Sequence, residues 1–449
     1  MEVRLSSRFL IVFLLVWPLL GGCTDKPLKT SGGVSSAESL ESGNAEANPV
    51  TIDFWFAFGG EYKKDFMTNV VIPFEKKYPG IKVNMTFVGT TGNTQASDKL
   101  LTAIAAYDPP DVALFDRFLI SSWADKGALT DLTGYVEASQ INPSDYYEAT
   151  WKEVQYKNGV YALPWGTDTR GMYYNKTLMK EAGLDPDKPP ATIEELDAMA
   201  AKMFKKNANG SYSQVGFIPW LNQGFLYTQG WNWGGQWEKD GELVPNDPKL
   251  IQALEWMTWY AKTYNMQSLD SFMNLTGQSG MNAFMTGKVG FVYDGNWLLN
   301  DLRKYTTKFE WGVAPMPAPS GQKPSTWAGG WSFVIPKGAK HEKEAWAFIK
   351  FVTSKEGVLQ WARRQTESND ITAMPAANKE LHLEGNPNLK VFLDQMPKAY
   401  TRPVSPVEAF LWNETFRIQD LAINGKGTPQ ELFNQLKRNV NAELAKLRQ

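Results

Sequence analysis

Cysteine and histidine are scarce in this chain. Its 449 residues include one cysteine, Cys23, and two histidines, His341 and His382. A single cysteine excludes a disulfide within the chain. Zinc sites draw mainly on cysteine and histidine, and Cys23 is distant in sequence from both histidines, so we expect neither a metal site nor a cofactor.

The chain also lacks an excess of charge and the common signatures of enzymes. Lys plus Arg number 46 and Asp plus Glu 48, which argues against a nucleic-acid binder. No G-x-S-x-G, P-loop or H-E-x-x-H motif occurs. A glycoside hydrolase remains an alternative, because its paired carboxylates need not be close in sequence.

The N-terminus has the pattern of a secretory signal. Basic residues precede an apolar run from Phe9 to Leu20, which is too short to span a bilayer as a helix. The sequence Leu20-Gly21-Gly22-Cys23 resembles a bacterial lipoprotein box, which implies a signal peptide over 1–22 and a lipid on Cys23. A plain signal peptide with an incidental cysteine is the alternative. Residues 23–49 are polar, lack aromatic residues and are expected to form a flexible tether.

The remaining chain alternates between strand-like and helical patterns. No later segment has the roughly 18 uninterrupted apolar residues of a membrane-spanning helix. The first strand-like segments are separated by helical stretches and run from Val50 to Phe58, Ile81 to Phe87 and Asp111 to Phe115. This order favours a parallel sheet with helices on both faces, and therefore an α/β fold. Further strands are predicted at Val289 to Tyr293 and Trp331 to Ile335, with capped helices after Thr192, Asp247 and Thr428.

Aromatic residues are abundant, with 18 Trp, 17 Tyr and 24 Phe. Flat rings near polar groups suit the apolar C–H faces and the hydroxyls of a sugar, and tryptophan adds an N–H donor. Trp297 and Trp331 stand beside glycines at predicted strand ends, which favours a ligand-facing position for both. Trp231 and Trp233, within the cluster from Trp220 to Trp237, are equally compatible with a ligand site and with a packed core.

Two carboxylates follow predicted strands directly. In open α/β sheets, ligands lie beyond the carboxyl ends of the strands. Asp116 and Asp294 occupy such positions. A ligand contact is the favoured interpretation for Asp116, with a helix N-cap as its alternative, and the cap is favoured for Asp294.

Five segments together resemble a known family. They are Leu20 to Cys23, Pro109 to Asp116, Tyr161 to Lys176, Gly287 to Trp297 and Trp327 to Pro336. Their types and order resemble the extracellular solute-binding proteins of ABC importers, in the carbohydrate-binding family that includes maltose-binding protein. The resemblance covers roughly residues 51–449.

The resemblance implies a type II periplasmic-binding-protein fold, with two α/β lobes and the ligand in the cleft between them. Lobe 1 would comprise 50–163 plus 317–370, and lobe 2 would comprise 164–316 plus 371–449. Hinge crossings would fall near 163–164, 313–316 and 372–375. The residues implied to line the cleft are Asp116, Asp168, Trp297, Gly330 and Trp331.

The function implied is that of a lipid-anchored, substrate-binding component of an ABC transporter, which captures a sugar or oligosaccharide. We expect no catalysis, no nucleic-acid partner, a monomer, contact with permease subunits and a location outside the cytoplasmic membrane. A receptor for a charged solute is a further alternative. A sugar-phosphate receptor would gather Arg and Lys in its cleft, and a polyamine receptor would gather acids.

Overall fold

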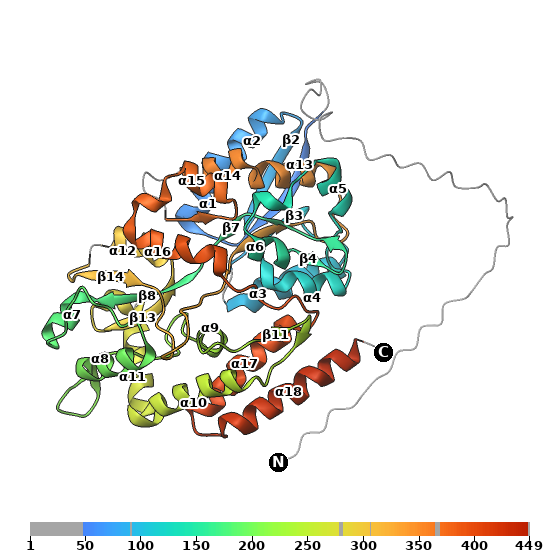
Figure 1. Ribbon diagram of the computed structural model, residues 1–449. Helices are drawn as coiled ribbons and strands as arrows, with labels where there is room; N and C mark the ends of the chain where they lie inside the picture. The colour runs from blue at the N-terminus through green and yellow to red at the C-terminus, as the bar shows by residue number, and fades with distance from the viewer. Residues whose placement is uncertain (1–47, 90–91, 278–281, 306, 364–368, 448–449) are drawn as a thin grey trace, which may run out of the picture. The chain divides into compact units, whose positions relative to one another are not determined.

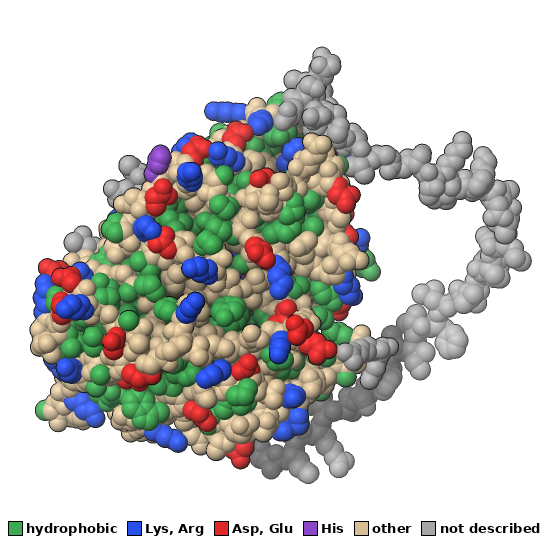
Figure 2. Space-filling model, in the orientation of Figure 1, with side chains coloured by type: hydrophobic (Ala, Val, Ile, Leu, Met, Phe, Trp, Pro, Cys, Tyr) green, Lys and Arg blue, Asp and Glu red, His purple; other side chains and the backbone are tan. Residues whose placement is uncertain are grey.

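The computed structural model describes residues 48–449 except 90–91, 278–281, 306, 364–368 and 448–449. The predicted signal peptide, Cys23 and nearly all of the predicted tether therefore lie outside the described residues. Within the described part of the chain, no helix is both long and apolar enough to cross a membrane. On the face drawn in Figure 2, basic and acidic side chains are interspersed over the described surface.

The larger sheet has five strands in the order β2-β1-β3-β15-β6. The predicted strands β1 (Val50–Phe56), β2 (Ile81–Phe87) and β3 (Val112–Asp116) are parallel, so their carboxyl ends meet at one edge. Alternate residues of β1 and β2 are buried, as their period-2 patterns predict. The strand β15 (Trp331–Val334) lies between β3 and β6 (Leu163–Pro164) and is antiparallel to both, so the sheet is mixed rather than purely parallel.

The smaller sheet has three antiparallel strands in the order β13-β8-β14. Its central strand, β8 (Arg170–Asn175), is buried along its whole length, and β13 (Phe291–Gly295) and β14 (Trp311–Ala314) flank it. This arrangement differs from the parallel sheet expected for an α/β fold. The mixture of α and β structure itself is confirmed.

The chain passes between the two sheets through short extended segments. After β6, the segment β7 (Gly166–Thr167) leads into β8, and it pairs with β16 (Ile371–Thr372). The segment between β14 and β15 connects the sheets a second time. These segments fall near the predicted hinge crossings, and the residue ranges assigned to the two lobes remain a prediction.

Helices cover the sheets on several sides (Figure 1). The first half of the chain contains α1 (Gly60–Phe66), α2 (Ile72–Lys77), α3 (Gly92–Ala105), α4 (Ile120–Asp125), α5 (Thr133–Ala138), α6 (Glu148–Glu153), α7 (Lys176–Glu181) and α8 (Ile193–Met203). The second half contains α9 (Leu226–Asn232), α10 (Pro248–Thr263), α11 (Met266–Gly277), α12 (Leu298–Lys304), α13 (Glu342–Thr353), α14 (Lys355–Ala362), α15 (Pro375–Glu380), α16 (Pro387–Gln395), α17 (Glu408–Ile423) and α18 (Pro429–Lys446).

The predicted helix starts are present. Thr192 and Thr428 each form a capping box with the glutamate three residues later, and Asp247 caps α10 ahead of Pro248. The last two helices, α17 and α18, pack against each other and against α10. The last helix is therefore held by α17 and α10, and α17 also packs against α9 and α4.

Candidate ligand-binding site

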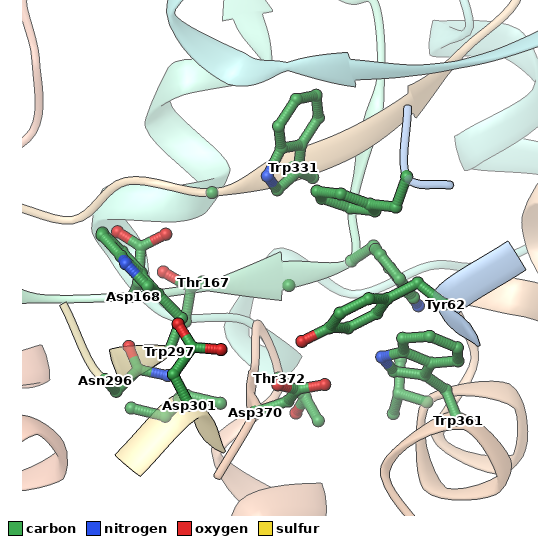
Figure 3. A pocket seen from close by; sticks show the side chains of 16 residues that line it. Tyr62, Thr167, Asp168, Asn296, Trp297, Asp301, Trp331, Trp361, Asp370 and Thr372 are labelled. Atoms are coloured by element: carbon green, nitrogen blue, oxygen red, sulfur yellow. The ribbon is translucent and has the colours of Figure 1, made fainter. Parts of the chain in front are cut away.

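A pocket of about 370 Å³ lies among residues that follow strands of both sheets. Six aromatic side chains line it, and Figure 3 shows Trp297, Trp331, Tyr62 and Trp361 arranged around a common space. The six are Phe58, Tyr62, Trp165, Trp297, Trp331 and Trp361. Rings on opposite sides of one space can hold a flat, partly apolar ligand between them.

Trp297 is positioned by the end of β13. The strand ends at Gly295, and Trp297 is the N-cap residue of α12. A Cβ at Gly295 would lie 2.0 Å from the Trp297 ring, so glycine is what lets the ring lie against the backbone. The Arg170 guanidinium lies 5.4 Å from the ring centroid, and the side chain is half-buried. The ring is thus fixed while part of its surface faces the pocket.

Trp331 and Gly330 form the neighbouring wall. Gly330 has φ of +124°, and a Cβ there would lie 2.3 Å from the Gly166 carbonyl oxygen, so a glycine is required. Trp331 begins β15 and pairs in register with Asp116. Its ring meets Phe58 edge to face, with 5.0 Å between the ring centroids. This wall therefore joins the ends of β1, β3 and β15.

The polar lining consists mainly of hydrogen-bond acceptors. It includes Asp168, Asp301 and Asp370, together with Thr167, Thr372 and Asn296, and the described lining residues include no Lys or Arg. Asp168 forms an ion pair with Arg170, which lies behind it. Asp370 accepts a hydrogen bond from Asn300 at 3.1 Å. The pocket therefore suits a ligand that donates hydrogen bonds, such as a polyol or a cation.

A buried ionic network lies beside the pocket. Glu153 is 3% exposed and accepts hydrogen bonds from Arg402 Nε at 2.8 Å and Arg117 Nε at 3.1 Å. Burial alone would raise the pKa of Glu153, but the two arginines outweigh it and the pKa is lowered. Arg117 also donates to the backbone oxygens of Gly166 and Gly329, so the network fixes the backbone on which the pocket is built.

Asp116 belongs to this network and is not among the residues that line the pocket. Its Oδ1 accepts from the Phe118 amide at 3.3 Å and from Arg402 at 3.2 Å. Burial raises the pKa of Asp116, and Arg402 opposes the rise. The structure thus gives Asp116 the capping position considered as its alternative, directly opposite Trp331 in the pairing of β3 with β15. Its predicted ligand contact remains a prediction.

Asp294 does not cap the helix that follows it, because the N-cap residue of α12 is Trp297. The carboxylate is instead buried and accepts hydrogen bonds from Asn222 at 2.9 Å and Asn282 at 2.6 Å. Burial raises the pKa of Asp294 to about 6. The favoured interpretation of Asp294 as a cap was therefore wrong, since α12 begins three residues too late for it.

Trp231 and Trp233 lie away from this pocket. Every residue of α9 is buried, and Trp231 is 3% exposed and stacks on Tyr400, with 5.5 Å between centroids. Trp233 packs against Trp256 at 4.6 Å. Trp231 also lines a second pocket of about 300 Å³, together with Tyr400 and Lys152. Glycines within the Trp cluster allow close packing of α10, which obscured the helical period in the sequence: a Cβ at Gly230 would lie 2.5 Å from Leu250.

Several lining residues were not identified from the sequence. Phe58 and Tyr62 follow β1, so the rule that selected Asp116 after β3 could have found them. Asp301 lies one helical turn after Trp297 and could have been found by that spacing. Trp361 packs in the core, where it is 5% exposed, and it also lines the pocket. No sequence signal pointed to Asp370.

The fold and the pocket define a class, the two-lobed binding proteins with a ligand site between α/β lobes. Comparison with protein families agrees. Residues 58–359 match the family described as bacterial extracellular solute-binding protein, and the chain belongs to this family. The family predicted from the sequence motifs is thereby confirmed.

Individual proteins of known structure extend the comparison. The chain is 28% identical to CpMnBP1, whose structure has mannotriose bound, with a TM-score of 0.77 over 87% of this chain and 100% of that one. It is 26% identical to an ABC transporter solute-binding protein of Thermotoga lettingae bound to α-D-tagatose, with a TM-score of 0.72 over 88% and 99%.

Relatives known by sequence are similarly distant. A protein of Brucella abortus named only as a binding protein is 26% identical over 441 residues, which cover 92% of this chain and 97% of that one. A maltooligosaccharide ABC transporter solute-binding lipoprotein of Streptococcus pneumoniae is 26% identical over 73% of this chain and 74% of its own.

Proposed function

We propose that this chain is the sugar-binding component of an ABC importer. The observation that carries the proposal is the pocket of about 370 Å³, which combines six aromatic side chains with carboxylate acceptors. Aromatic faces match the C–H faces of a pyranose, and carboxylates accept hydrogen bonds from its hydroxyls. The named ligands of the similar proteins, mannotriose, α-D-tagatose and maltooligosaccharide, support a sugar.

Closure of the two lobes around the ligand is part of the proposal. The walls of the pocket come from both sheets, so a ligand that contacts both walls stabilises the closed state over the open one. We assign 50–163 plus 317–370 to one lobe and 164–316 plus 371–449 to the other. The closed form would then dock on the permease subunits.

The charge of the pocket separates the remaining candidates. Three aspartates and no described Lys or Arg line it, which disfavours a sugar phosphate and favours, as a second candidate, a cationic solute such as a polyamine. A thermal-unfolding screen with mannotriose, maltotriose, glucose 6-phosphate and spermidine distinguishes them. A ligand at 100 times its dissociation constant adds about 2.7 kcal/mol of stability. We expect a neutral sugar to raise Tm, and stabilisation by spermidine alone would favour the second candidate.

We also propose that the chain binds sugar without hydrolysing it. The alternative needs one carboxyl group to protonate the leaving oxygen and another to act from the opposite side. Asp168, which lines the pocket, is held in an ion pair with Arg170, as suits a hydrogen-bond acceptor. Release of reducing sugar from an oligosaccharide, in proportion to protein concentration and lost in Asp301→Asn, would support the hydrolase instead.

The proposed location is outside the cytoplasmic membrane, with a lipid on Cys23 and a tether over residues 23–49. The family of extracellular solute-binding proteins, and the relative of Streptococcus pneumoniae that is named a lipoprotein, support this. A lipid would keep the binding domain close to its permease and raise its local concentration. Mass spectrometry of the protein from membranes should find lipid on Cys23, and Cys23→Ser should release it. An unmodified Cys23 would contradict the anchor.

A further inference from the structure

Phe87 is an exposed aromatic residue that ends β2 and is not among the residues that line the pocket. Its side chain is 47% exposed. A helix packed over this end of the sheet would bury the ring. In the parallel register of β1 and β2, Phe87 pairs with Phe56. Phe58, two residues after Phe56, lines the pocket. Phe87 therefore lies at the strand edge that carries the pocket, one strand outward.

The ring of Phe87 is held in place by glycine backbone. A Cβ at Gly59 or at Gly89 would each lie 3.0 Å from Cζ of the Phe87 ring. Gly59 has φ of −97°, an angle that other residues adopt readily, so its conformation does not require glycine. The space that the missing Cβ leaves for the ring is the feature that an alanine would disturb. The ring is thus positioned without being buried.

An exposed side chain of α1 lines the pocket beside Phe58. Tyr62, in α1, lines it and is 40% exposed, with its ring 5.8 Å from that of Phe58. The volume of about 370 Å³ is near the lower end for ligand pockets, which run from roughly 300 to 1,000 Å³. A sugar that extends from the pocket past Phe58 and Gly59 would meet the ring of Phe87, because its Cζ lies 3.0 Å from the position of a Cβ at Gly59.

We propose that Phe87 is a stacking platform for a sugar ring outside the pocket, and that the ligand is accordingly an oligosaccharide whose affinity rises with length. This inference rests on the proposed sugar-binding function. Phe87 contributes only to ligands long enough to reach it. The residues that line the pocket contribute to ligands of every length. The two sets of residues therefore differ in a measurable way.

The experiment compares a ladder of sugars on matched variants. Binding of mannobiose, mannotriose and mannotetraose, and of maltose, maltotriose and maltotetraose, is measured by calorimetry. Phe87→Leu removes the flat ring but keeps apolar volume, and Gly59→Ala keeps the ring but displaces it. Trp259→Ala, at a residue 46% exposed on α10, removes an aromatic side chain that does not line the pocket.

In the wild type, the longer members of one series should bind more tightly than the disaccharide. Phe87→Leu and Gly59→Ala should each weaken binding of the longer sugars by at least about fivefold and leave the affinity for the disaccharide unchanged. The control Trp259→Ala should leave the affinity for sugars of every length unchanged. A wild type that binds disaccharides but gains nothing with length, or a Phe87→Leu variant that weakens all lengths equally or none, would overturn the inference alone. A wild type that binds no sugar would overturn the proposed function as well.

Discussion

Replacing Trp297 by alanine separates a ligand contact from a packing contact. The side chain lines the pocket and is half-buried, with Gly295 on one side of its ring and the Arg170 guanidinium 5.4 Å from its centroid. A tryptophan buries roughly 200 Å² in a full contact. If a sugar covers about 80 Å² of the ring, at about 25 cal/mol per Å² its removal costs about 2 kcal/mol of binding, or about 30-fold in affinity.

Trp165 provides the matched comparison. It also lines the pocket, but it is 4% exposed and its ring packs against Phe66, Phe333 and Trp361. Trp165→Ala should therefore lose about 3–5 kcal/mol of folding stability, the usual cost of deleting a buried aromatic side chain. Trp297→Ala should lose much less stability, since its ring is only half-buried.

Urea unfolding without ligand and calorimetry with the best-binding sugar of the screen measure the two effects separately. We expect Trp297→Ala, and likewise Trp331→Ala, to keep most of the wild-type stability and to bind the sugar about 30-fold more weakly. Trp231→Ala, which removes a buried ring outside this pocket, should instead lose stability and keep its affinity. Unchanged affinity in folded Trp297→Ala would refute the stacking role.

Three further predictions concern the frame of the site. Gly330→Ala forces a Cβ to within 2.3 Å of the Gly166 oxygen at a φ of +124°, so urea unfolding should show a loss of about 2 kcal/mol or more, and unchanged stability would contradict the requirement for glycine. The ion pair of Glu61 and Lys304, 3.1 Å apart, joins α1 to α12. Because both side chains are exposed, this ion pair is weak. Glu61→Lys, which breaks it, should therefore weaken sugar binding by no more than about fivefold, and adding Lys304→Glu should restore the affinity at low salt. Burial raises the pKa of Asp294 to about 6 from 3.8, so its contribution to stability is present below about pH 4 and is lost as the pH rises through 6. Asp294→Asn should remove this loss, up to about 3 kcal/mol, and identical pH profiles of unfolding would contradict it.

The sequence predicted local structure well where a pattern was local. The alternation in Ile81–Phe87 and the capping boxes at Thr192 and Thr428 depend on residues close in the chain, and all are present. The position of β15 does not depend on residues close in the chain. Ser332 donates to the Phe115 carbonyl oxygen across 217 residues of sequence, and no local pattern specifies that the strand enters between β3 and β6 or that it is antiparallel.

The residues of the candidate site also divide into those that a sequence pattern predicts and those that only the fold brings together. Trp297 and Trp331 stand where strands meet glycines, and the family resemblance added Asp168 and Gly330; all four line the pocket. Trp361 reaches the pocket because α14 brings its ring to 5.3 Å from that of Trp165, and Asp370 reaches it because the next strand, β16, pairs with β7. For Trp231 the sequence left a ligand site and a packed core equally open. The glycines beside it allow close packing of a buried helix, a contact that no local pattern specifies.

The most direct test of the account is a crystal structure of the protein with a bound oligosaccharide. The account predicts one sugar ring between Trp297 and Trp331, with hydroxyl groups donating to Asp168 or Asp301. Sugar bound elsewhere, for example in the second pocket beside Trp231 and Tyr400, with the space between Trp297 and Trp331 filled only by water, would contradict it.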